Sequence, residues 1–365
     1  MGMLADQVDH IIGVDTHRDS HSAAAVSSTG AVEAKTTVRA DAFGYRRLLR
    51  FARRDAPGRR AWAIESSGSF GAGLATFLLA HGEWVVEVDR PKRPARRNGA
   101  KSDELDAVRA AHEALTRDHL AQPRQRGDRE AVRVLLITRR GAILSRTKAI
   151  NQLKSLVITA REELRHQLRN LDTETLVHRC SRLRTLPSHS DEHRATVIAL
   201  RHTARRILNL EAEANDLETE IERLVKRNVP VLLDQLGVGP ITAAQLYCSW
   251  SHTGRLRHES AFAMLAGAAP IPASSGQTIR YRLNRGGDRD LNCALHTIVL
   301  TRLKHDPATR AYAARRAAEG KTPREIKRCL KRYVARQLYR LLEARGPALQ
   351  RPPRPPHART FGHCS

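Results

Sequence analysis

The spacing of hydrophobic residues predicts strands mixed with helices in the first third of the chain. Short apolar runs in HIIGVDTH, AWAIESSG and EWVVEVD are typical of buried strands, and SAAAVSS and AVEAKTTVRA are strand-like stretches separated by a Ser-Thr-Gly turn. Helical patterns cover residues 69–81 and 103–115, and Asp41 is a candidate cap for a helix running through Arg54. This order predicts a mixed sheet covered by helices over residues 10–116.

Helical periodicity dominates the middle of the chain. Residues 129–160 fit one long Arg-rich helix, and a less regular stretch follows through Ser190. Between Leu200 and Leu224, apolar residues recur at alternating steps of three and four, which is an a/d heptad seam. So narrow a seam packs against another helix, either residues 129–160 in a hairpin or a second copy in a coiled coil. Pro230 ends the pattern.

These patterns predict an α/β fold followed by helical regions, in four segments. The pattern of residues 231–345 is mostly helical, and the tail that follows, with RPPRPPH, has a composition typical of disorder. The segments are an α/β domain at 8–118, a helical coiled-coil region at 126–229, a C-terminal domain at 230–345 and a basic tail at 346–365.

Basic residues strongly outnumber acidic ones. The 365 residues include 63 Lys and Arg against 38 Asp and Glu, which gives a formal net charge of +25. This excess favours a polyanionic partner, because each neutralised phosphate releases counterions and strengthens binding. A solvated basic surface is the other interpretation, and composition alone does not separate the two.

The cysteines and the apolar runs exclude several other classes of protein. The five cysteines form no Cys-x-x-Cys pair, so the sequence indicates neither a zinc site nor a disulfide framework. No N-terminal signal pattern is present, and no apolar run approaches the roughly 18 residues of a membrane helix. We therefore expect a cytoplasmic protein without a membrane partner.

Four acidic residues stand where a sheet and a helix could gather them. Asp15 and Glu65 each end a predicted strand, and Asp103 and Asp106 lie three apart at the start of a predicted helix, on one face. Carboxylate oxygens are the ligands that Mg²⁺ prefers, and four acids brought close repel one another unless a cation neutralises them. The pattern predicts a site for Mg²⁺ or Mn²⁺.

Each of these residues also has a simpler interpretation. Asp103 alone could be a helix cap. Asp15 is harder to explain in that way, because an acid that closes an apolar strand is costly without a partner. His17 and Asp19 follow closely, and His17 could be a further ligand, could orient one, or could simply lie at the surface.

A candidate phosphate-binding turn lies in LDQLGVGPITAAQLY. The pattern is a helix, a tight Gly-x-Gly turn and a second helix, which predicts a helix-hairpin-helix. Turn amides and the next helix N-terminus can hold a backbone phosphate without reading sequence. We associate Gly237, Gly239 and Thr242 with that DNA contact. A plain helix–helix corner is the alternative.

The N-terminal motifs resemble a known transposase domain. GVDTHRDSHSAAAV, IESSGSFGAGLATFL, VVEVDRPKRPARR and KSDELDA are similar to the first domain of the insertion-sequence one-hundred-and-ten family of transposases. That domain resembles the RuvC nuclease, has an RNase H-like fold and carries an Asp-Glu-Asp-Asp tetrad. The tetrad falls on Asp15, Glu65, Asp103 and Asp106, which the resemblance makes catalytic metal ligands.

The C-terminal segment FAMLAGAAPIPASSGQTIRYRLNRGGDRDLNCAL resembles the serine transposase domain of the same family. The hallmark serine before glycine falls on Ser275, with Ser274 as the neighbouring alternative. A serine hydroxyl is a poor nucleophile unless a base, a metal or a polarising shell activates it. Arginines downstream could stabilise a pentavalent phosphate: Arg280, Arg282, Arg285 and Arg289.

The resemblance implies a mechanism and several partners. It implies a nucleoid-associated recombinase that acts on double-stranded DNA as a dimer or tetramer, with Mg²⁺-assisted transesterification by Ser275 and a phosphoserine link to DNA. It also implies a structured guide RNA, the bridge RNA, so that base pairing and not the protein selects the sequence. The site could combine the tetrad of one subunit with Ser275 of another.

Three alternatives remain open at this point. A RuvC-like nuclease or junction resolvase would use only the carboxylate tetrad, with water as the nucleophile. A non-enzymatic nucleic-acid-binding protein would use only the basic charge. An inactive copy of a transposase would have the same residues without the activity.

Overall fold

The computed structural model describes residues 3–65, 67–88, 103–118, 120–272, 281–282, 284 and 286–344. The chain forms two compact units. The first comprises Met1–Arg126, Ser251–His258 and Glu343–Ser365, and the second comprises Gly127–Trp250 and Glu259–Leu342. Among the described residues, no helix has the length and apolar character needed to cross a membrane.

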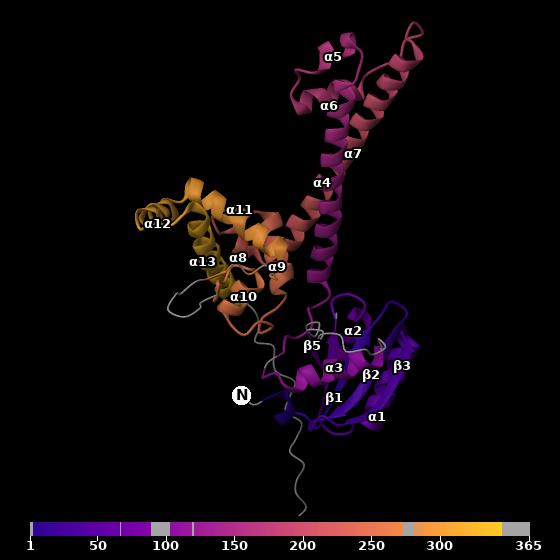
Figure 1. Ribbon diagram of the computed structural model, residues 1–365, viewed down its shortest axis with the longest axis vertical. Helices are drawn as coiled ribbons and strands as arrows, with labels where there is room; N and C mark the ends of the chain where they lie inside the picture. Colours follow the sequence, from indigo (N-terminus) through magenta and orange to yellow (C-terminus); the bar gives the residue numbers. More distant parts are fainter. Residues whose placement is uncertain are drawn as a thin grey trace, which may run out of the picture. The chain divides into compact units, whose positions relative to one another are not determined.

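The first unit contains the predicted mixed sheet (Figure 1). Its strand order is β3-β2-β1-β4-β5, with β1 antiparallel to β2 and parallel to β4. The bounds are β1 His10–Thr16, β2 Ser20–Ser27, β3 Val32–Arg39, β4 Arg60–Glu65 and β5 Trp84–Val88, with helices α1 Ala42–Asp55, α2 Ala72–Ala80 and α3 Asp103–Leu115 and a short 3-10 turn at Leu4–Asp6. Such a sheet is consistent with an RNase H-like fold.

Helices cover the two faces of this sheet. On one face, Val14 and Ile64 share a buried cluster with α1 and α2, and on the other face Ile11 and Ala63 pack with the alanines of α3. Asp41 caps α1 as predicted, because its carboxylate accepts the amide of Gly44 at 2.8 Å. The small residues of α3 let this helix lie directly on β1.

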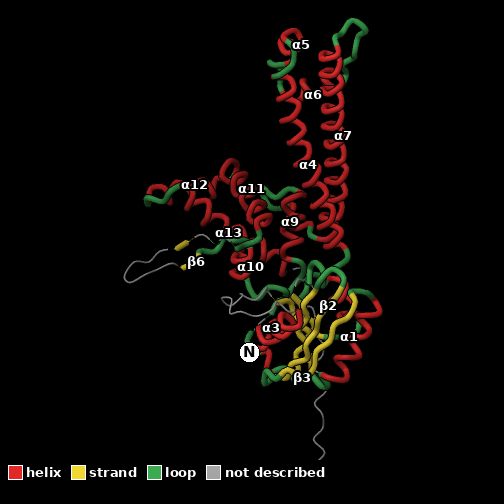
Figure 2. Tube along the Cα trace, turned by 45° about the vertical axis from the view of Figure 1, so that its right-hand side comes forward, coloured by secondary structure: helices red, strands yellow, loops and turns green. Residues whose placement is uncertain are grey.

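A long antiparallel helix pair begins the second unit (Figure 2). Helix α4 spans Asp128–Ile158 and α7 spans Asp191–Asn228. Arg139 pairs with Glu218 and Arg146 with Glu211, both at 2.6 Å, so the two helices run in opposite directions. The seam residues Leu200, Thr203, Ile207, Ala214, Ile221 and Leu224 are buried within the chain. The intrachain hairpin is therefore confirmed, whereas a coiled coil between subunits stays a prediction.

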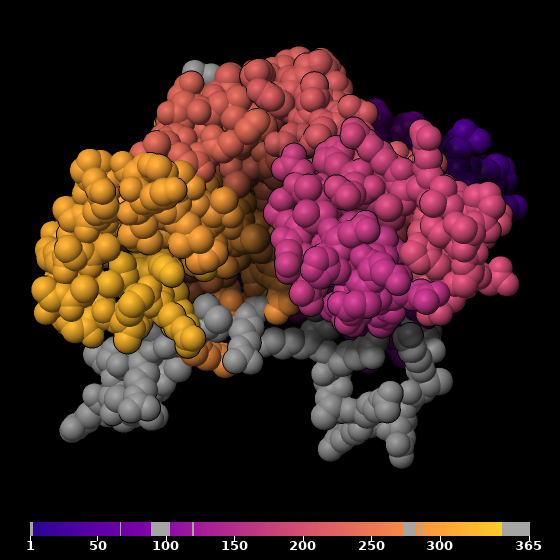
Figure 3. Space-filling view, turned by 90° about the horizontal axis from the view of Figure 1, so that it is seen from above, coloured from indigo at the N-terminus to yellow at the C-terminus, as the bar shows by residue number. Residues whose placement is uncertain are grey.

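Two short helices occupy the stretch that the sequence left irregular. Helices α5 Glu162–Leu168 and α6 Thr173–Ser181 lie at the end of the hairpin where α4 finishes and α7 begins (Figure 1). Seen from above, residues of this end form the magenta surface in Figure 3. Leu168, Val177 and Cys180 pack there against Leu153 and Leu200. Periodicity did not reveal these helices because each is at most nine residues long.

The rest of the second unit is mostly helical. The α7 helix ends before Pro230, as predicted. The remaining elements are α8 Pro230–Leu233, α9 Pro240–Trp250, α10 Glu259–Leu265, β6 Ile271–Pro272, β7 Tyr281–Arg282, α11 Arg289–His305, α12 Pro307–Ala318 and α13 Pro323–Glu343. The predicted basic tail at 346–365 lies outside the described residues.

Candidate metal centre

The sheet brings two acids of the predicted tetrad to neighbouring strand ends. Val14 of β1 lies opposite Ile64 of β4 in the parallel register, so the next residues, Asp15 and Glu65, follow at the same edge. The hydroxyl of Thr16 donates to the carbonyl oxygen of Glu65 at 3.0 Å and ties the two strand ends together. Side chains alternate along a strand, so Asp15 and Glu65 project to the face opposite Val14 and Ile64.

That face is the one covered by α3, which carries the other two acids. Gly13 allows the close approach, since a Cβ atom there would lie 2.0 Å from the carbonyl oxygen of Ala107. Asp103 begins α3, one turn before Ala107, and therefore lies over the end of β1 near Asp15. The glycine in the strand thus sets the distance between Asp15 of β1 and the acids of α3.

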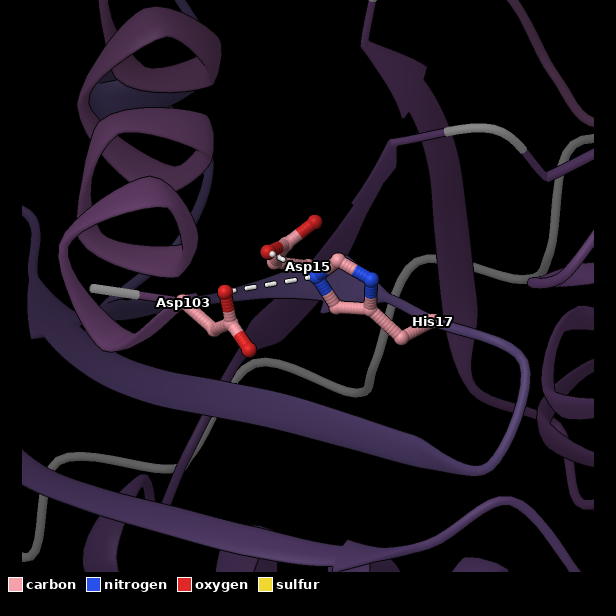
Figure 4. Close-up of side chains that lie close together, drawn as sticks. All are labelled: Asp15, His17 and Asp103. Atoms are coloured by element: carbon pink, nitrogen blue, oxygen red, sulfur yellow. Dashed lines mark hydrogen bonds and ion pairs between the residues drawn. The ribbon is translucent and has the colours of Figure 1, made fainter. Parts of the chain in front are cut away.

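His17 connects an acid of the strand with an acid of the helix (Figure 4). The Nε2 atom of His17 lies 3.2 Å from Oδ2 of Asp15 and 3.4 Å from Oδ1 of Asp103. A tight turn holds His17 in place, because its amide donates to the carbonyl of Ser20 at 2.9 Å. One ligand atom from each of Asp15, His17 and Asp103 lies within 4.8 Å of the other two.

Negative charge accumulates at this point. Burial raises the pKa of Asp15, the carboxylates of Asp103 and Asp106 raise it further, and the neighbouring His17 opposes this rise. Asp106 also accepts a hydrogen bond from Arg109 at 2.7 Å. A cation bound among these groups would relieve the repulsion between the carboxylates.

The donor set fits a divalent cation. Two carboxylates and an imidazole within 4.8 Å offer the oxygen and nitrogen ligands that divalent ions accept. Glu65 and Asp106 fall outside that three-residue group, although the structure places both beside it. The sequence left the role of His17 open, and the geometry places its Nε2 atom against both carboxylates, where it can orient them or serve as a further ligand.

The predicted phosphate-binding turn lies between two helices of the second unit. Gly237 has φ +83°, a conformation that favours glycine, and the turn leads into α9. The amide of Gly239 donates to the hydroxyl of Thr242 at 3.0 Å, and this hydroxyl donates to the Gly239 carbonyl at 2.9 Å. Thr242 thus caps the start of α9 from within the chain, and its contact with DNA stays a prediction.

The predicted serine and two of the arginines lie outside the described residues, namely Ser275, its neighbour Ser274, Arg280 and Arg285. Arg282 is an exposed residue of β7, and Arg289 is the first residue of α11. Asp288 caps α11 by accepting the amides of Asp290 and Leu291 at 3.0 Å. Asp288 therefore has a structural role at the start of α11.

Comparisons with known proteins agree with both halves of the chain. A family model described as "Transposase" matches residues 12–160, and one described as "Transposase IS116/IS110/IS902 family" matches residues 230–314. Together the two matches cover more than half of the chain.

Three relatives are proteins of insertion elements. The "Insertion element IS900 uncharacterized 42 kDa protein" of Mycobacterium paratuberculosis is 25% identical over 322 residues, which cover 72% of this chain and 78% of that protein. The IS116 44.8 kDa protein of Streptomyces clavuligerus is 25% identical and covers 85% of this chain and 88% of its own length. The IS110 43.6 kDa protein of Streptomyces coelicolor is 36% identical over 109 residues, 29% of this chain and 27% of that protein. The chain belongs to the IS110 family of transposases, enzymes that cut and rejoin DNA.

Proposed function

We propose that this transposase recombines DNA by transesterification, with the tetrad Asp15, Glu65, Asp103 and Asp106 as ligands of Mg²⁺ or Mn²⁺ and Ser275 as the nucleophile. The observation that carries the proposal is the approach of Asp15 and Asp103, which come from a strand and a helix and lie with His17 within 4.8 Å. Carboxylates that repel one another at a half-buried strand end are costly in a protein that does not bind a cation there.

The acids and His17 have separate tasks in this proposal. Asp15 and Asp103 supply ligand oxygens from rigid elements, and Glu65 and Asp106 complete the set from the next strand and the same helix. His17 holds the two nearest carboxylates in one orientation through its Nε2 atom. When bound, the divalent cation supplies positive charge that stabilises the phosphate oxygens during the transfer.

The serine step conserves the phosphodiester bond. The Oγ atom of Ser275 forms a bond to phosphorus and loses its proton, while the bond from phosphorus to one DNA oxygen breaks and that oxygen takes up a proton. Rejoining reverses the exchange with another DNA hydroxyl, so no nucleotide cofactor is consumed. We assign stabilisation of the pentavalent phosphate to the nearby guanidinium groups of Arg280, Arg282, Arg285 and Arg289.

DNA and RNA binding complete the proposal. The net charge of +25 supports binding to polyanions, and Gly237, Gly239 and Thr242 are the proposed contact with a DNA backbone phosphate. The family resemblance is the support for a structured guide RNA, for a dimer or tetramer, and for a site that joins the tetrad of one subunit to Ser275 of another.

The test uses the full-length protein with the RNA that copurifies from its native host and DNA that spans the element ends. Covalent protein–DNA adducts are resolved on a denaturing gel for the wild type, Ser275→Ala and the matched control Ser274→Ala. We expect adducts for the wild type and for the control, and none for Ser275→Ala. Cleavage that persists in Ser275→Ala without adducts would indicate a nuclease that uses water, and a wild type that binds DNA without cutting it would indicate a binding protein.

A further inference from the structure

The segment Ser251–His258 joins α9 to α10, yet it packs with the first unit. The hydroxyl of Ser251 accepts the amide of Gln125 at 3.0 Å, and the ring of His252 lies 3.2 Å from the side-chain oxygen of Gln122. Ser251, His252 and Arg255 are each no more than 5% exposed. So complete a burial of polar side chains in an irregular segment indicates that the segment has a fixed place in the first unit.

Arg255 makes the contact of greatest consequence in this segment. Its Nη2 atom lies 3.1 Å from Oε2 of Glu87 on β5, and both side chains are largely buried. A buried guanidinium requires a buried partner of opposite charge, because desolvating either group alone is costly. The pair therefore fixes the position of the Glu87 carboxylate.

The other oxygen of that carboxylate holds the loop that follows β4. Oε1 of Glu87 accepts the hydroxyl of the buried Ser67 at 2.7 Å. Ser67 lies two residues after Glu65, the tetrad member at the end of β4. A chain of contacts thus runs from Arg255 through Glu87 to the backbone next to Glu65.

Glu87 cannot itself take the place of a tetrad ligand. It is the register partner of Ile64, so its side chain projects to the face of α1 and α2, opposite the face that Asp15 and Glu65 share. Its effect on the tetrad must pass through the backbone. Thr16 holds the carbonyl of Glu65, and Ser67 fixes the chain two residues later.

We propose that Arg255 is a positioning residue for the metal centre, acting through Glu87 and Ser67 to hold Glu65 where it can bind the cation. This inference rests on the proposed metal-binding role of the tetrad. In this proposal the segment Ser251–His258, from the second half of the sequence, helps to position a metal ligand of the first unit. Mutation of residues that contact the metal ligands, but not the metal itself, typically lowers metal affinity or activity by about 10–100-fold.

The test measures Mn²⁺ binding to the full-length protein by electron paramagnetic resonance, and in parallel the Mg²⁺ concentration that gives half-maximal DNA cleavage. We expect Ser67→Ala and Arg255→Met each to weaken Mn²⁺ binding roughly tenfold and to raise the Mg²⁺ requirement to match. Arg255→Lys should recover part of the loss. The double variant should bind Mn²⁺ only slightly more weakly than whichever single variant has the lower affinity. Both substitutions act through the same residue, Glu87, so their effects should not add.

Arg257→Met is the matched control. Arg257 lies in the same segment, but its side chain is half-exposed and pairs with Asp118 at 3.6 Å, not with Glu87. The Arg257→Met protein should therefore bind Mn²⁺ with the affinity of the wild type. Ser67→Ala removes one hydroxyl and keeps the protein testable if Arg255→Met does not fold.

The outcomes separate the two proposals. If Asp15→Asn loses Mn²⁺ binding while Ser67→Ala and Arg255→Met retain wild-type affinity, the positioning role is overturned and the metal centre stands. If Asp15→Asn binds Mn²⁺ as the wild type does, the metal centre fails and the positioning role fails with it.

Discussion

Replacing Gly13 by alanine should separate the two halves of the candidate metal centre. The new methyl group would lie 2.0 Å from the carbonyl oxygen of Ala107 and 2.6 Å from the backbone nitrogen of Ala111. A comfortable carbon–oxygen contact is about 3.3 Å, so α3 would have to move by about 1 Å. Both obstructing atoms are backbone, so no side chain can rotate away.

The cost lies at the upper end of the range for overpacking, about 3 kcal/mol. For a unit of this size, such a loss lowers the melting temperature by about 10 °C. The displacement also carries Asp103 away from Asp15, so Mn²⁺ binding should weaken together with stability. Scanning calorimetry measures the first quantity, and a Mn²⁺ titration of the folded protein measures the second.

A second glycine provides the control. Gly141 lies within α4, and an added Cβ there would meet no packed neighbour within 4 Å beyond the adjoining backbone of its own helix. Alanine there should therefore stabilise the helix by up to about 1 kcal/mol and leave Mn²⁺ binding unchanged. A Gly13→Ala protein that melts and binds Mn²⁺ like the wild type would refute the idea that the contact between β1 and α3 sets the distance between the acids.

Three further predictions concern charge, capping and metal. Burial raises the pKa of Glu83, but hydrogen bonds from Arg60 and Trp62 outweigh it and leave the pKa below its usual value. The stabilisation by the ionised Glu83 carboxylate is therefore present above about pH 4 and is lost as the pH falls through the depressed pKa. Glu83→Gln should lower the free energy of unfolding by about 2 kcal/mol near neutral pH and by progressively less in acid, as measured by denaturant melts across that pH range. Asp288→Ala removes the N-cap of α11 and should lower the free energy of unfolding by about 1 kcal/mol in the same melts, whereas Asp288→Asn should cost less. Mn²⁺ at a hundred times its dissociation constant should raise the free energy of unfolding by about 2.7 kcal/mol, and a chelator should reverse this increase. An equal increase in the Asp15→Asn protein would contradict the proposal that Asp15 is a metal ligand.

Local patterns were sufficient to predict the elements that carry the acids. The apolar run of residues before Asp15 predicts a buried strand, and β1 ends one residue after that acid. The helical pattern of 103–115 matches α3, and Asp41 caps α1 as its position suggested. Alternation and periodicity report on neighbours within a few residues, which is the range over which strands and helices form.

The contacts of His17 could not be predicted in the same way. Its two acidic partners come from β1 and from α3, which begins more than eighty positions later. The contact depends on how closely α3 approaches Gly13 and on the turn between His17 and Ser20. The glycine was the available signal, since a glycine inside an apolar strand often marks the close approach of another backbone.

The pairing of Arg255 with Glu87 spans 168 positions and shows why linear segmentation of the sequence is incomplete. Glu87 interrupts the apolar run of a predicted buried strand, where a charged side chain is unexpected, and an arginine in an irregular stretch such as that of Arg255 normally lies in solvent. In the buried pair, each side chain compensates the charge of the other. An N-terminal domain transferred without residues 251–258 would therefore retain all four tetrad acids, yet would leave Glu87 without the guanidinium that holds it. It follows that the structural unit around the candidate metal centre is defined by compensated buried charge as well as by the strands and helix that carry the acids.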